Sequence, residues 1–402
     1  MISLTASEKL TITILANSIA GPMSGGDRIW IECAKRWVKK PNVSINVFTT
    51  AEGLKRGQQY GLTGVNYKLW SKPARFLGHS VYLLYFWRTL RGCINALVPL
   101  HSSGERNVIF SSSDFLPDSI PAWVSKIKNK NVEWLAAFYL FAPSLSDKTS
   151  PYRGKLFARG LFYYISQLPA LYLIRRDADL VWVTSEIDRW RFIDGVRFTP
   201  DKVTGVRGGV DVKTPASLPE PSKKEYDAVF IGRFHTQKGV LELIDIWRNV
   251  CNKKPNAKLA MIGIGELEGQ VREKIVAYGL QNNVSLLGFK DGLEKLEIFK
   301  KSKLVVHPAV YDSGGMAACE AMACRLPGVS FDLPALVTYY PKGMLKTPCY
   351  DFVGFAENIV QLLDDAELYE KVANDALDWA KEWDWDKRAD VLFNYLVDRC
   401  DS

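Results

Sequence analysis

Both halves of the chain alternate short segments rich in β-branched residues with longer segments of helical periodicity. This alternation is typical of βαβ units, in which a crossover helix joins neighbouring strands of a parallel sheet. At about 100–200 residues per domain, a length of 402 residues indicates two domains, each able to bury its own core. We therefore predict an α/β chain with two doubly wound parallel sheets.

The expected strands are short and regularly spaced. In the first half they are residues 10–16, 44–48, 108–111, 134–137 and 180–184, with a helix expected at 28–39. After a connector with Pro, Ser and Lys at 214–224, the second half continues with strands at 227–231, 258–262, 284–287, 304–307 and 328–330. An amphipathic helix pattern at 383–397 ends the chain, and by its pattern alone it could belong to either domain.

The two halves differ in charge. Residues 1–200 hold 26 Lys and Arg against 14 Asp and Glu, whereas residues 201–402 hold 26 against 30. A content of 47% hydrophobic and 24% charged residues is ordinary for a globular protein and excludes a disordered or fibrous chain. The net charge of +8 therefore conceals a basic first half and a mildly acidic second half.

The sequence predicts neither a signal peptide nor a transmembrane span. Glu8 and Lys9 precede the first apolar run, an order unlike that of a signal peptide. Residues 80–100 and 157–174 are rich in apolar and aromatic residues, but arginines interrupt both, so neither forms a clean span. The seven cysteines are scattered without a CxxC pair, which indicates a reduced cytosolic chain without a zinc site.

The most informative segment is DSGGMAACEAMACRLP at residues 312–327. Its two glycines follow an expected strand, and the amides of Gly315, Met316 and Ala317 would point outward at a helix N-terminus, which suits a phosphate. Glu320 lies about one and a half turns into that helix, where it could reach a ribose diol. A simple turn followed by a solvated glutamate would give the same pattern.

A second segment, FIGRFHTQKG at residues 230–239, follows the first expected strand of the second half. Arg233 and Lys238 would lie on its loop at the carboxyl edge of a parallel sheet, where such sheets bind ligands. Two cations there suit a leaving diphosphate, whose charge grows in the transition state. An exposed basic loop is the alternative. His235 has no charge-relay partner at helical or loop spacing, and we assign it no role.

A third element, Ser24-Gly25-Gly26-Asp27, lies between the first expected strand and the first expected helix. Its glycines would let the backbone of the first domain face a ligand held by the second. The segment lacks the spacings of dinucleotide-binding and P-loop sites, so it indicates close approach without specifying the ligand.

Taken in order, these motifs resemble those of the retaining GT-B glycosyltransferases of family 4, of glycosyltransferase group 1 type, over nearly the whole chain. Asp312 to Glu320 is similar to the family's Glu-x7-Glu motif, and EAMACRLP to its EAMAxGxP. Further matches are GR…KG at residues 232–239, MIGIGE at 261–266, ADLVWVTS at 178–185, RGGVD at 207–211 and the glycine pair at 25–26.

The resemblance implies a GT-B fold, with two Rossmann-like domains facing across a cleft. Residues 1–212 and the terminal helix 383–402 would form the acceptor-binding domain, and residues 213–382 the nucleotide-sugar-binding domain. The implied catalytic residues are Arg233, Lys238, Asp312 and Tyr139. The implied donor-binding residues are Gly25, Gly26, Gly232, Gly263, Phe289, Lys290, Gly315, Met316, Ala317 and Glu320.

Each of these residues receives its role from the position it matches. Arg233 and Lys238 would hold the diphosphate of a UDP-, GDP- or ADP-sugar, and Glu320 would hold its ribose. Phe289 and Lys290 would lie beside the base. The family needs no metal, so the resemblance implies neither a metal nor another cofactor. In such enzymes the leaving diphosphate helps to deprotonate the acceptor, which attacks the same face of the sugar.

Three positions depart from the family pattern. Asp312 is one methylene shorter than the usual Glu. Tyr139 stands where many members have His, and a tyrosine can donate a hydrogen bond but cannot be cationic near pH 7. Arg325 replaces a Gly at a turn where a left-handed backbone is costly for Arg, so we expect either a different turn or an anion that its side chain reaches.

In enzymes of this type the first domain holds the acceptor, which gives its basic residues a functional interpretation. Arginines flank aromatic stretches such as residues 81–87 and 161–164, and this combination suits the interface of an anionic membrane. We expect Arg75, Arg88 and Arg91 to contact the membrane or the acceptor. Residues 80–100 are the better membrane candidate, whereas 161–174 fit a buried core helix equally well.

We therefore predict a hexosyltransferase that is cytoplasmic and peripheral on the inner face of the cell membrane, with a lipid-linked saccharide or glycolipid as acceptor. A soluble anionic acceptor and a non-catalytic GT-B protein that binds a sugar nucleotide remain open alternatives. A nucleic-acid-binding protein is disfavoured, because no reader motif accompanies the basic residues.

Overall fold

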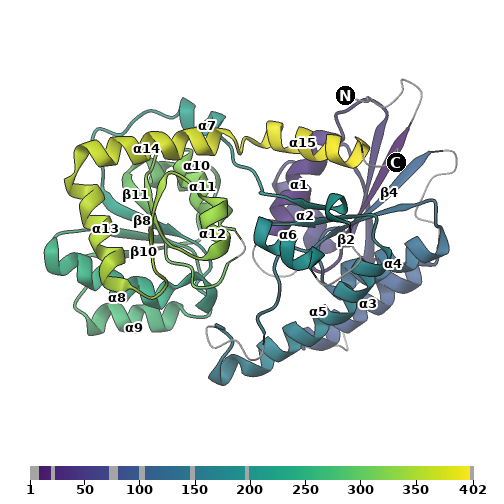
Figure 1. Cartoon of the computed structure of the whole chain (residues 1–402), viewed down its shortest axis with the longest axis horizontal. Coiled ribbons are helices and arrows are strands. Elements are labelled where there is room, and N and C mark those ends of the chain that lie inside the picture. The colour runs from purple at the N-terminus through teal and green to yellow at the C-terminus, as the bar shows by residue number, and fades with distance from the viewer. Residues whose placement is uncertain are drawn as a thin grey trace. The chain divides into compact units, whose positions relative to one another are not determined.

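The structure is a computed structural model that describes residues 9–19, 23–71, 80–98, 105–144, 150–194, 199–312 and 314–398. The chain divides into two compact units (Figure 1). Unit 1 comprises residues 1–208 and 385–402, and unit 2 comprises residues 209–384. The last helix therefore belongs to the same unit as the N-terminal half of the chain.

The described part of unit 1 contains a seven-stranded parallel sheet in the order β3-β2-β1-β4-β5-β6-β7. Its strands are β1 (Leu10–Ala16), β2 (Val43–Thr50), β3 (Asn66–Ser71), β4 (Arg106–Ser111), β5 (Glu133–Ala137), β6 (Leu180–Val183) and β7 (Val203–Gly205). The strand order reverses between β1 and β4, the point at which a doubly wound sheet opens toward a ligand.

Helices cover both faces of this sheet (Figure 1). They are α1 (Gly25–Trp37), α2 (Ala51–Gln59), α3 (Val81–Ala96), α4 (Leu116–Lys128), α5 (Phe157–Asp177), α6 (Glu186–Ile193) and α15 (Trp385–Asp398). Trp37 joins α1 to α15, because its indole nitrogen donates to the carbonyl of Ala389 at 2.8 Å. Trp182 of β6 packs against Trp37, while Val181 and Val183 point to the other face, where α4 and α5 lie.

The described residues of unit 2 form a six-stranded parallel sheet in the order β10-β9-β8-β11-β12-β13. Its strands are β8 (Tyr226–Ile231), β9 (Leu259–Ile262), β10 (Val284–Gly288), β11 (Ser302–His307), β12 (Gly328–Phe331) and β13 (Met344–Thr347). Its helices are α7 (Lys213–Ser217), α8 (Val240–Lys253), α9 (Glu268–Ala277), α10 (Gly292–Lys300), α11 (Met316–Met322), α12 (Pro334–Tyr339), α13 (Phe352–Asp364) and α14 (Ala366–Lys381).

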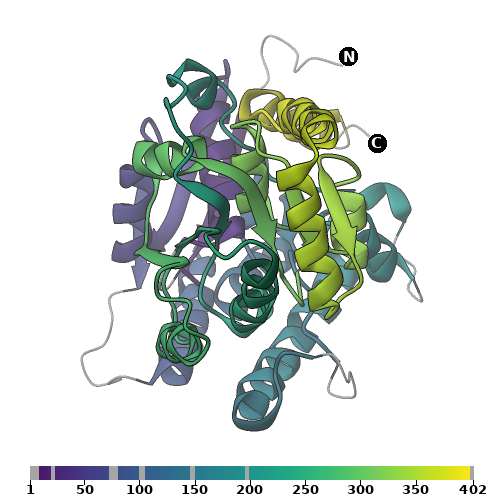
Figure 2. The same cartoon turned by 90° about the vertical axis from the view of Figure 1, so that its left-hand side faces the viewer.

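Helices cover both faces of the sheet of unit 2 (Figures 1 and 2), and an apolar core lies on each face. Phe230 and Met261 contribute to the core beneath α8, α9 and α13. Their strand neighbours Val229 and Ile262 contribute to the opposite core, beneath α10, α11 and α14. Burial on both faces explains why these strands read as continuous apolar runs rather than alternating patterns.

The predicted fold class, an α/β chain with two doubly wound parallel sheets, is confirmed. The helix expected at 28–39 instead spans Gly25–Trp37, because Ser24 caps it: its hydroxyl accepts from the amide of Asp27, whose carboxylate accepts from the amide of Ser24. Gly25 and Gly26 thus form the first turn of α1 rather than a loop. Within the described residues, no helix is long and apolar enough to cross a membrane.

Candidate active site

The loops at the carboxyl edge of the unit 2 sheet pack backbone against backbone. The amide of Gly232, after β8, bonds to the carbonyl of Ile262 at 3.1 Å, and the amide of Gly263 bonds to that of Gly288 at 2.8 Å. Gly263 has a φ of +142°, and a Cβ atom there would lie 1.9 Å from the carbonyl oxygen of Gly232. Gly232 and Gly263, both implied in donor binding, therefore lie in closely packed neighbouring loops.

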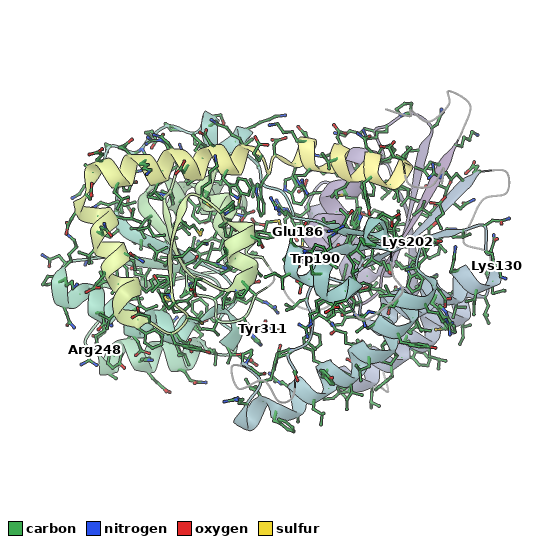
Figure 3. All side chains as sticks on the ribbon, in the orientation of Figure 1. Lys130, Glu186, Trp190, Lys202, Arg248 and Tyr311 are labelled. Carbon is green, nitrogen blue, oxygen red and sulfur yellow. The ribbon has the colours of Figure 1, made fainter. Side chains whose placement is uncertain are left out.

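The loop after β8 is also fastened to the segment after β11. The carbonyl of Gln237 accepts from the amide of Val310 at 3.0 Å, and Gly239, with a φ of +64°, lies against the carbonyl of Pro308. Tyr311, labelled in Figure 3, extends from the segment after β11. This fastening brings Lys238 to Asp312, with 2.5 Å between Nζ and Oδ2. Two residues that the sequence separates by 74 positions thus form one ion pair.

Asp312 has a second basic neighbour that the sequence analysis missed. Nε2 of the buried His307, the last residue of β11, lies 3.4 Å from Oδ2 of Asp312. Burial alone would raise the pKa of Asp312, but Lys238 and His307 outweigh it and hold that pKa well below its usual range. Burial lowers the pKa of His307, so its imidazole is neutral near pH 7. The site therefore presents an ionised carboxylate at neutral pH.

The double glycine before α11 is required by space as well as by backbone conformation. Gly315 has a φ of +139°, and a Cβ atom on it would lie 2.7 Å from Nε2 of His307. A Cβ atom on Gly314 would lie 2.8 Å from the ring of Tyr339. The amides of Met316 and Ala317 follow at the start of α11. The glycines thus allow α11 to begin directly above the His307 side chain.

Gly315→Ala should lower the free energy of unfolding by about 2–3 kcal/mol, because it combines an unfavourable backbone conformation with a steric clash against His307. Urea unfolding followed by circular dichroism would measure it. Gly269→Ala in α9 is the matched control, since nothing lies within 4 Å of its Cβ position; it should be neutral or stabilising by up to about 1 kcal/mol. Equal effects of the two substitutions would contradict this explanation.

Glu320 lies on α11, and its Oε2 atom is 2.9 Å from Nζ of Lys295 on α10. Lys295 also donates to Oδ1 of Asp291, the residue before α10, at 2.9 Å. None of the sequence motifs includes Lys295. The sequence feature that could have indicated its role is its position one turn before the apolar Phe299, which places a lysine on the buried side of α10.

Phe289 and Lys290 lie between β10 and α10, directly before Asp291. Phe289 is 54% exposed, so its ring is available to stack on a planar group. Lys290 forms an ion pair with Glu294 at 3.1 Å. The structure thus places the segment implied in base binding one residue from the Lys295 network. Arg233 is exposed at the same carboxyl edge, after β8.

His235 has a charged neighbour that lies beyond helical or loop spacing in the sequence. Oε1 of Glu266 lies 3.7 Å from its Nε2 atom, and its Nδ1 atom accepts from the amide of Gln237 at 3.3 Å. Glu266 follows β9, so the acidic neighbour of His235 comes from another loop and not from nearby positions in the sequence. The imidazole helps to shape the loop that carries Lys238.

In unit 1, the structure brings Gly26 and Tyr139 together. Tyr139 follows β5, and a Cβ atom on Gly26 would lie 2.7 Å from its ring. The Tyr139 hydroxyl is buried and has no hydrogen-bond partner among the described residues, and burial raises its pKa well above the usual value. The ring therefore packs against α1, while the hydroxyl points into the interior of the unit.

Two of the three arginines expected at the membrane or acceptor are described, and they differ. Arg88 donates to the carbonyls of Asn17 and Ile19 at 3.1 and 2.8 Å, so it braces the segment after β1 and is unavailable to a lipid surface. Arg91 is exposed, with its guanidinium 5.8 Å from the ring of Trp87. Arg75 lies outside the described residues.

Arg325 adopts the left-handed backbone expected of a glycine, with a φ of +63°. Its guanidinium reaches Glu370 at 2.5 Å and Asn374 at 2.9 Å, both on α14. Of the two expected outcomes, the structure shows the one in which the side chain reaches an anion.

Arg325→Ala should lower the free energy of unfolding by about 0.5–1 kcal/mol, because it keeps the unfavourable backbone and removes the anchor on α14. Arg325→Gly removes both, and should stay within about 0.5 kcal/mol of the parent chain. The two variants would be compared by urea unfolding. A glycine variant less stable than the alanine variant would overturn this interpretation.

Residues 215–379 match the family model described as "Glycosyl transferases group 1". An uncharacterized glycosyltransferase of Methanocaldococcus jannaschii is 29% identical over 208 residues, which cover 42% of this chain and 50% of the relative. The poly(glycerol-phosphate) alpha-glucosyltransferase of Bacillus subtilis is 28% identical over 173 residues, which cover 42% of this chain and 25% of the relative. The chain thus matches half or less of the length of these curated relatives.

Two solved structures share the fold over nearly the full length of both chains. A TarM mutant of S. aureus, in complex with UDP among other ligands, has a TM-score of 0.71 at 13% identity and covers 98% of this chain and 100% of its own. HepE of Anabaena, in complex with UDP-glucose, has a TM-score of 0.70 at 17% identity. The match covers 96% of this chain and 99% of the HepE chain. Residues 215–379 therefore form a domain of the group 1 glycosyl transferases, within a chain of GT-B fold.

Proposed function

We propose that the chain is a retaining hexosyltransferase that takes a sugar from a nucleotide-sugar donor without a metal or other cofactor. The observation that carries the proposal is the pairing of Lys238 with Asp312 and of Lys295 with Glu320 at the carboxyl edge of the unit 2 sheet. The first pair lies where the strand order reverses, after β8 and β11, in the domain that matches the family model.

The chemistry follows from the charges at this edge. Lys238 exchanges Asp312 for the donor diphosphate, and the exposed Arg233 adds a second cation. The bond between the sugar C1 atom and the diphosphate oxygen breaks, and the negative charge that develops on the leaving group is stabilised by both cations. The acceptor oxygen bonds to C1 on the same face, and its proton passes to the leaving diphosphate. Once its ion pair with Lys238 is broken, the Asp312 carboxylate accepts a hydrogen bond from a sugar hydroxyl.

The donor class is proposed from the site and from what the structural neighbours bind. HepE was solved with UDP-glucose and TarM with UDP. In this chain a ring at Phe289 and a carboxylate at Glu320 are available for a base and a ribose. The site residues do not select among UDP-, GDP- and ADP-sugars, so all three classes belong in the first experiment.

The acceptor side of the proposal rests on an exposed apolar surface of unit 1, which we call the α3–α5 face. One side of each helix presents large apolar side chains that are 45–63% exposed. They are Leu83, Phe86, Leu90 and Ile94 on α3, Leu97 directly after it, and Phe157, Ile165, Leu168 and Tyr172 on α5. The helices meet where the ring of Phe162 lies 4.6 Å from Tyr82 and 6.3 Å from Phe86. Such a clustered surface marks an interaction site, unlike apolar residues exposed singly.

The charge of this face favours an anionic lipid surface over a protein partner. Helices α3 and α5 contain five arginines, of which Arg88 turns inward, and one acidic residue, Asp177, which pairs with Arg176 at 2.7 Å. Arg91 and Arg159 are exposed beside the apolar rows. We propose that the enzyme is peripheral on the cytoplasmic face of the membrane, with α3 and α5 lying in the interface, and that its acceptor is a lipid-linked saccharide or glycolipid.

A donor screen tests the proposal. The purified chain would be incubated with UDP-, GDP- and ADP-sugars, with and without EDTA, and with lipid-linked or soluble anionic acceptors. We expect one donor class to be consumed, equally in EDTA, and faster with the lipid-linked acceptor. Consumption only with soluble acceptors favours the soluble alternative, and binding without consumption favours a non-catalytic protein. Loss of activity in EDTA that Mg²⁺ restores would refute metal independence.

A further inference from the structure

Lys295 is a buried cation that none of the motifs accounts for. Its side chain is 8% exposed, and its Nζ atom lies 2.9 Å from Oδ1 of Asp291 and 2.9 Å from Oε2 of Glu320. Lysine is almost never buried to this degree unless it is paired. Burial alone would lower its pKa, but the two carboxylates outweigh that effect and raise it. The three groups therefore form a charged network with one excess negative charge.

The network fixes one oxygen of Glu320 and leaves the other available. Oε2 accepts from Lys295, whereas Oε1 accepts no hydrogen bond from the residues that the structure describes. The Glu320 side chain is 20% exposed, so Oε1 can meet a ligand. A glutamate without such a partner would sample several rotamers, and ordering it on binding would cost affinity.

The same lysine connects two segments that would face different parts of one nucleoside. Glu320 lies on α11, and Asp291 directly follows Phe289 and Lys290. Lys295 is thus a direct link between the carboxylate implied in ribose binding and the segment implied in base binding. If either segment shifted, one of its two ion pairs would break.

We propose that Lys295 is a positioning residue for the ribose of the donor: it holds Glu320 by Oε2 so that Oε1 accepts from a ribose hydroxyl. The inference rests on the proposed function, because it needs a nucleotide at this site. Lys295 itself touches neither the sugar nor the diphosphate, so it acts through Glu320 on ribose recognition and leaves the transfer chemistry to Lys238 and Arg233.

The test compares nucleotides with and without the ribose hydroxyls. Calorimetry would measure Kd for UDP, GDP and ADP, and then for the 2′,3′-dideoxy form of the tightest binder. A hydrogen bond to a charged group predicts that the parent chain prefers the ribonucleotide by about tenfold or more. Lys295→Met should reduce this preference to below about threefold, and Lys295→Arg should restore part of it. A purely structural role would weaken both ligands equally and leave the ratio unchanged.

Lys300→Met is the matched control. Lys300 lies on the same helix, is similarly buried and forms an ion pair with Glu220, but it does not contact Glu320. It should keep the ribose preference of the parent chain. If Lys295→Met alone unfolds, the double variant Lys295→Met with Asp291→Asn removes one charge of each sign and should show the same loss of preference.

The outcomes separate the inference from the proposed function. A parent chain that binds none of the three diphosphates overturns both. A parent chain that prefers the ribonucleotide, together with a Lys295→Met variant that keeps this preference, overturns the inference and leaves the proposed function standing.

Discussion

Lys238→Ala should lower kcat/KM for sugar transfer by about 10²–10³-fold, which corresponds to roughly 3–4 kcal/mol of transition-state stabilisation. Lys238 is the cation that the fold fastens at the carboxyl edge, through the bonds of Gln237 to the segment after β11. Because negative charge on the diphosphate grows as the sugar departs, most of the loss should appear in kcat rather than in KM. Steady-state kinetics with the donor found in the screen would measure both.

The same substitution makes a prediction about pH. Lys238 lowers the pKa of Asp312, so its removal should raise that pKa. If ionised Asp312 accepts a sugar hydroxyl, the acid limb of the pH–rate profile should move to higher pH in the Lys238→Ala variant.

Lys274→Ala is the matched control for this substitution. Lys274 also forms an ion pair at 2.5 Å, with Asp245, but it lies on α9 and Asp245 on α8. It should retain kcat/KM within about twofold, since surface ion pairs contribute little. A Lys238→Ala enzyme with the kinetics of the control would rule out a role for Lys238 in catalysis.

Phe86→Glu with Leu90→Glu should weaken binding to anionic vesicles by at least about tenfold. The two substitutions remove apolar area from the centre of the α3 row and add negative charge to a helix that has no acidic residue. Burying each side chain in the interface is worth about 1.5–3 kcal/mol at most, and repulsion from anionic lipid adds to the loss. Flotation with phosphatidylserine-containing vesicles at low and high salt would measure it.

Val276→Glu with Val353→Glu is the control, because both valines are similarly exposed but lie on α9 and α13 of unit 2. It should bind vesicles as the parent chain does. Failure of the parent chain to float at low salt would refute the membrane proposal while leaving the donor site untouched. Strong binding that salt does not reduce would mean that the apolar rows act without help from Arg91 and Arg159.

The sequence predicted the architecture well because parallel strands buried on both faces carry a strong apolar signal. All ten expected strands overlap observed ones, and β1 has the predicted bounds. The missed strands β3, β7 and β13 lie at sheet edges, where β3 includes Lys68 and Asn66 and β7 has only three residues. At such positions strand formation depends on a neighbour that a single sequence window does not contain.

The candidate site was less readable for a related reason. Glycines and cations close together in the sequence indicate a ligand-binding loop. The residues that form ion pairs with those cations lie on other helices and loops, far away in the sequence. Lys295 and Glu320 are separated by 25 positions, and neither spacing nor composition links them. Arg88 looked like a surface cation within an apolar run, yet it turns toward the segment after β1, because the side of α3 that faces the sheet is set by packing against α4.

Proton NMR of donor consumption by the parent chain tests the central claim most directly. With the nucleotide sugar selected in the screen, we expect the chain to release the sugar, or transfer it to an acceptor, with the anomeric configuration that it had in the donor. The product must be observed before the free sugar mutarotates, and Lys238→Ala should slow its formation by about 10²–10³-fold. If the chain consumes none of the UDP-, GDP- and ADP-sugars, with or without an acceptor, the proposed function is contradicted. A product with the inverted anomeric configuration would refute a retaining mechanism.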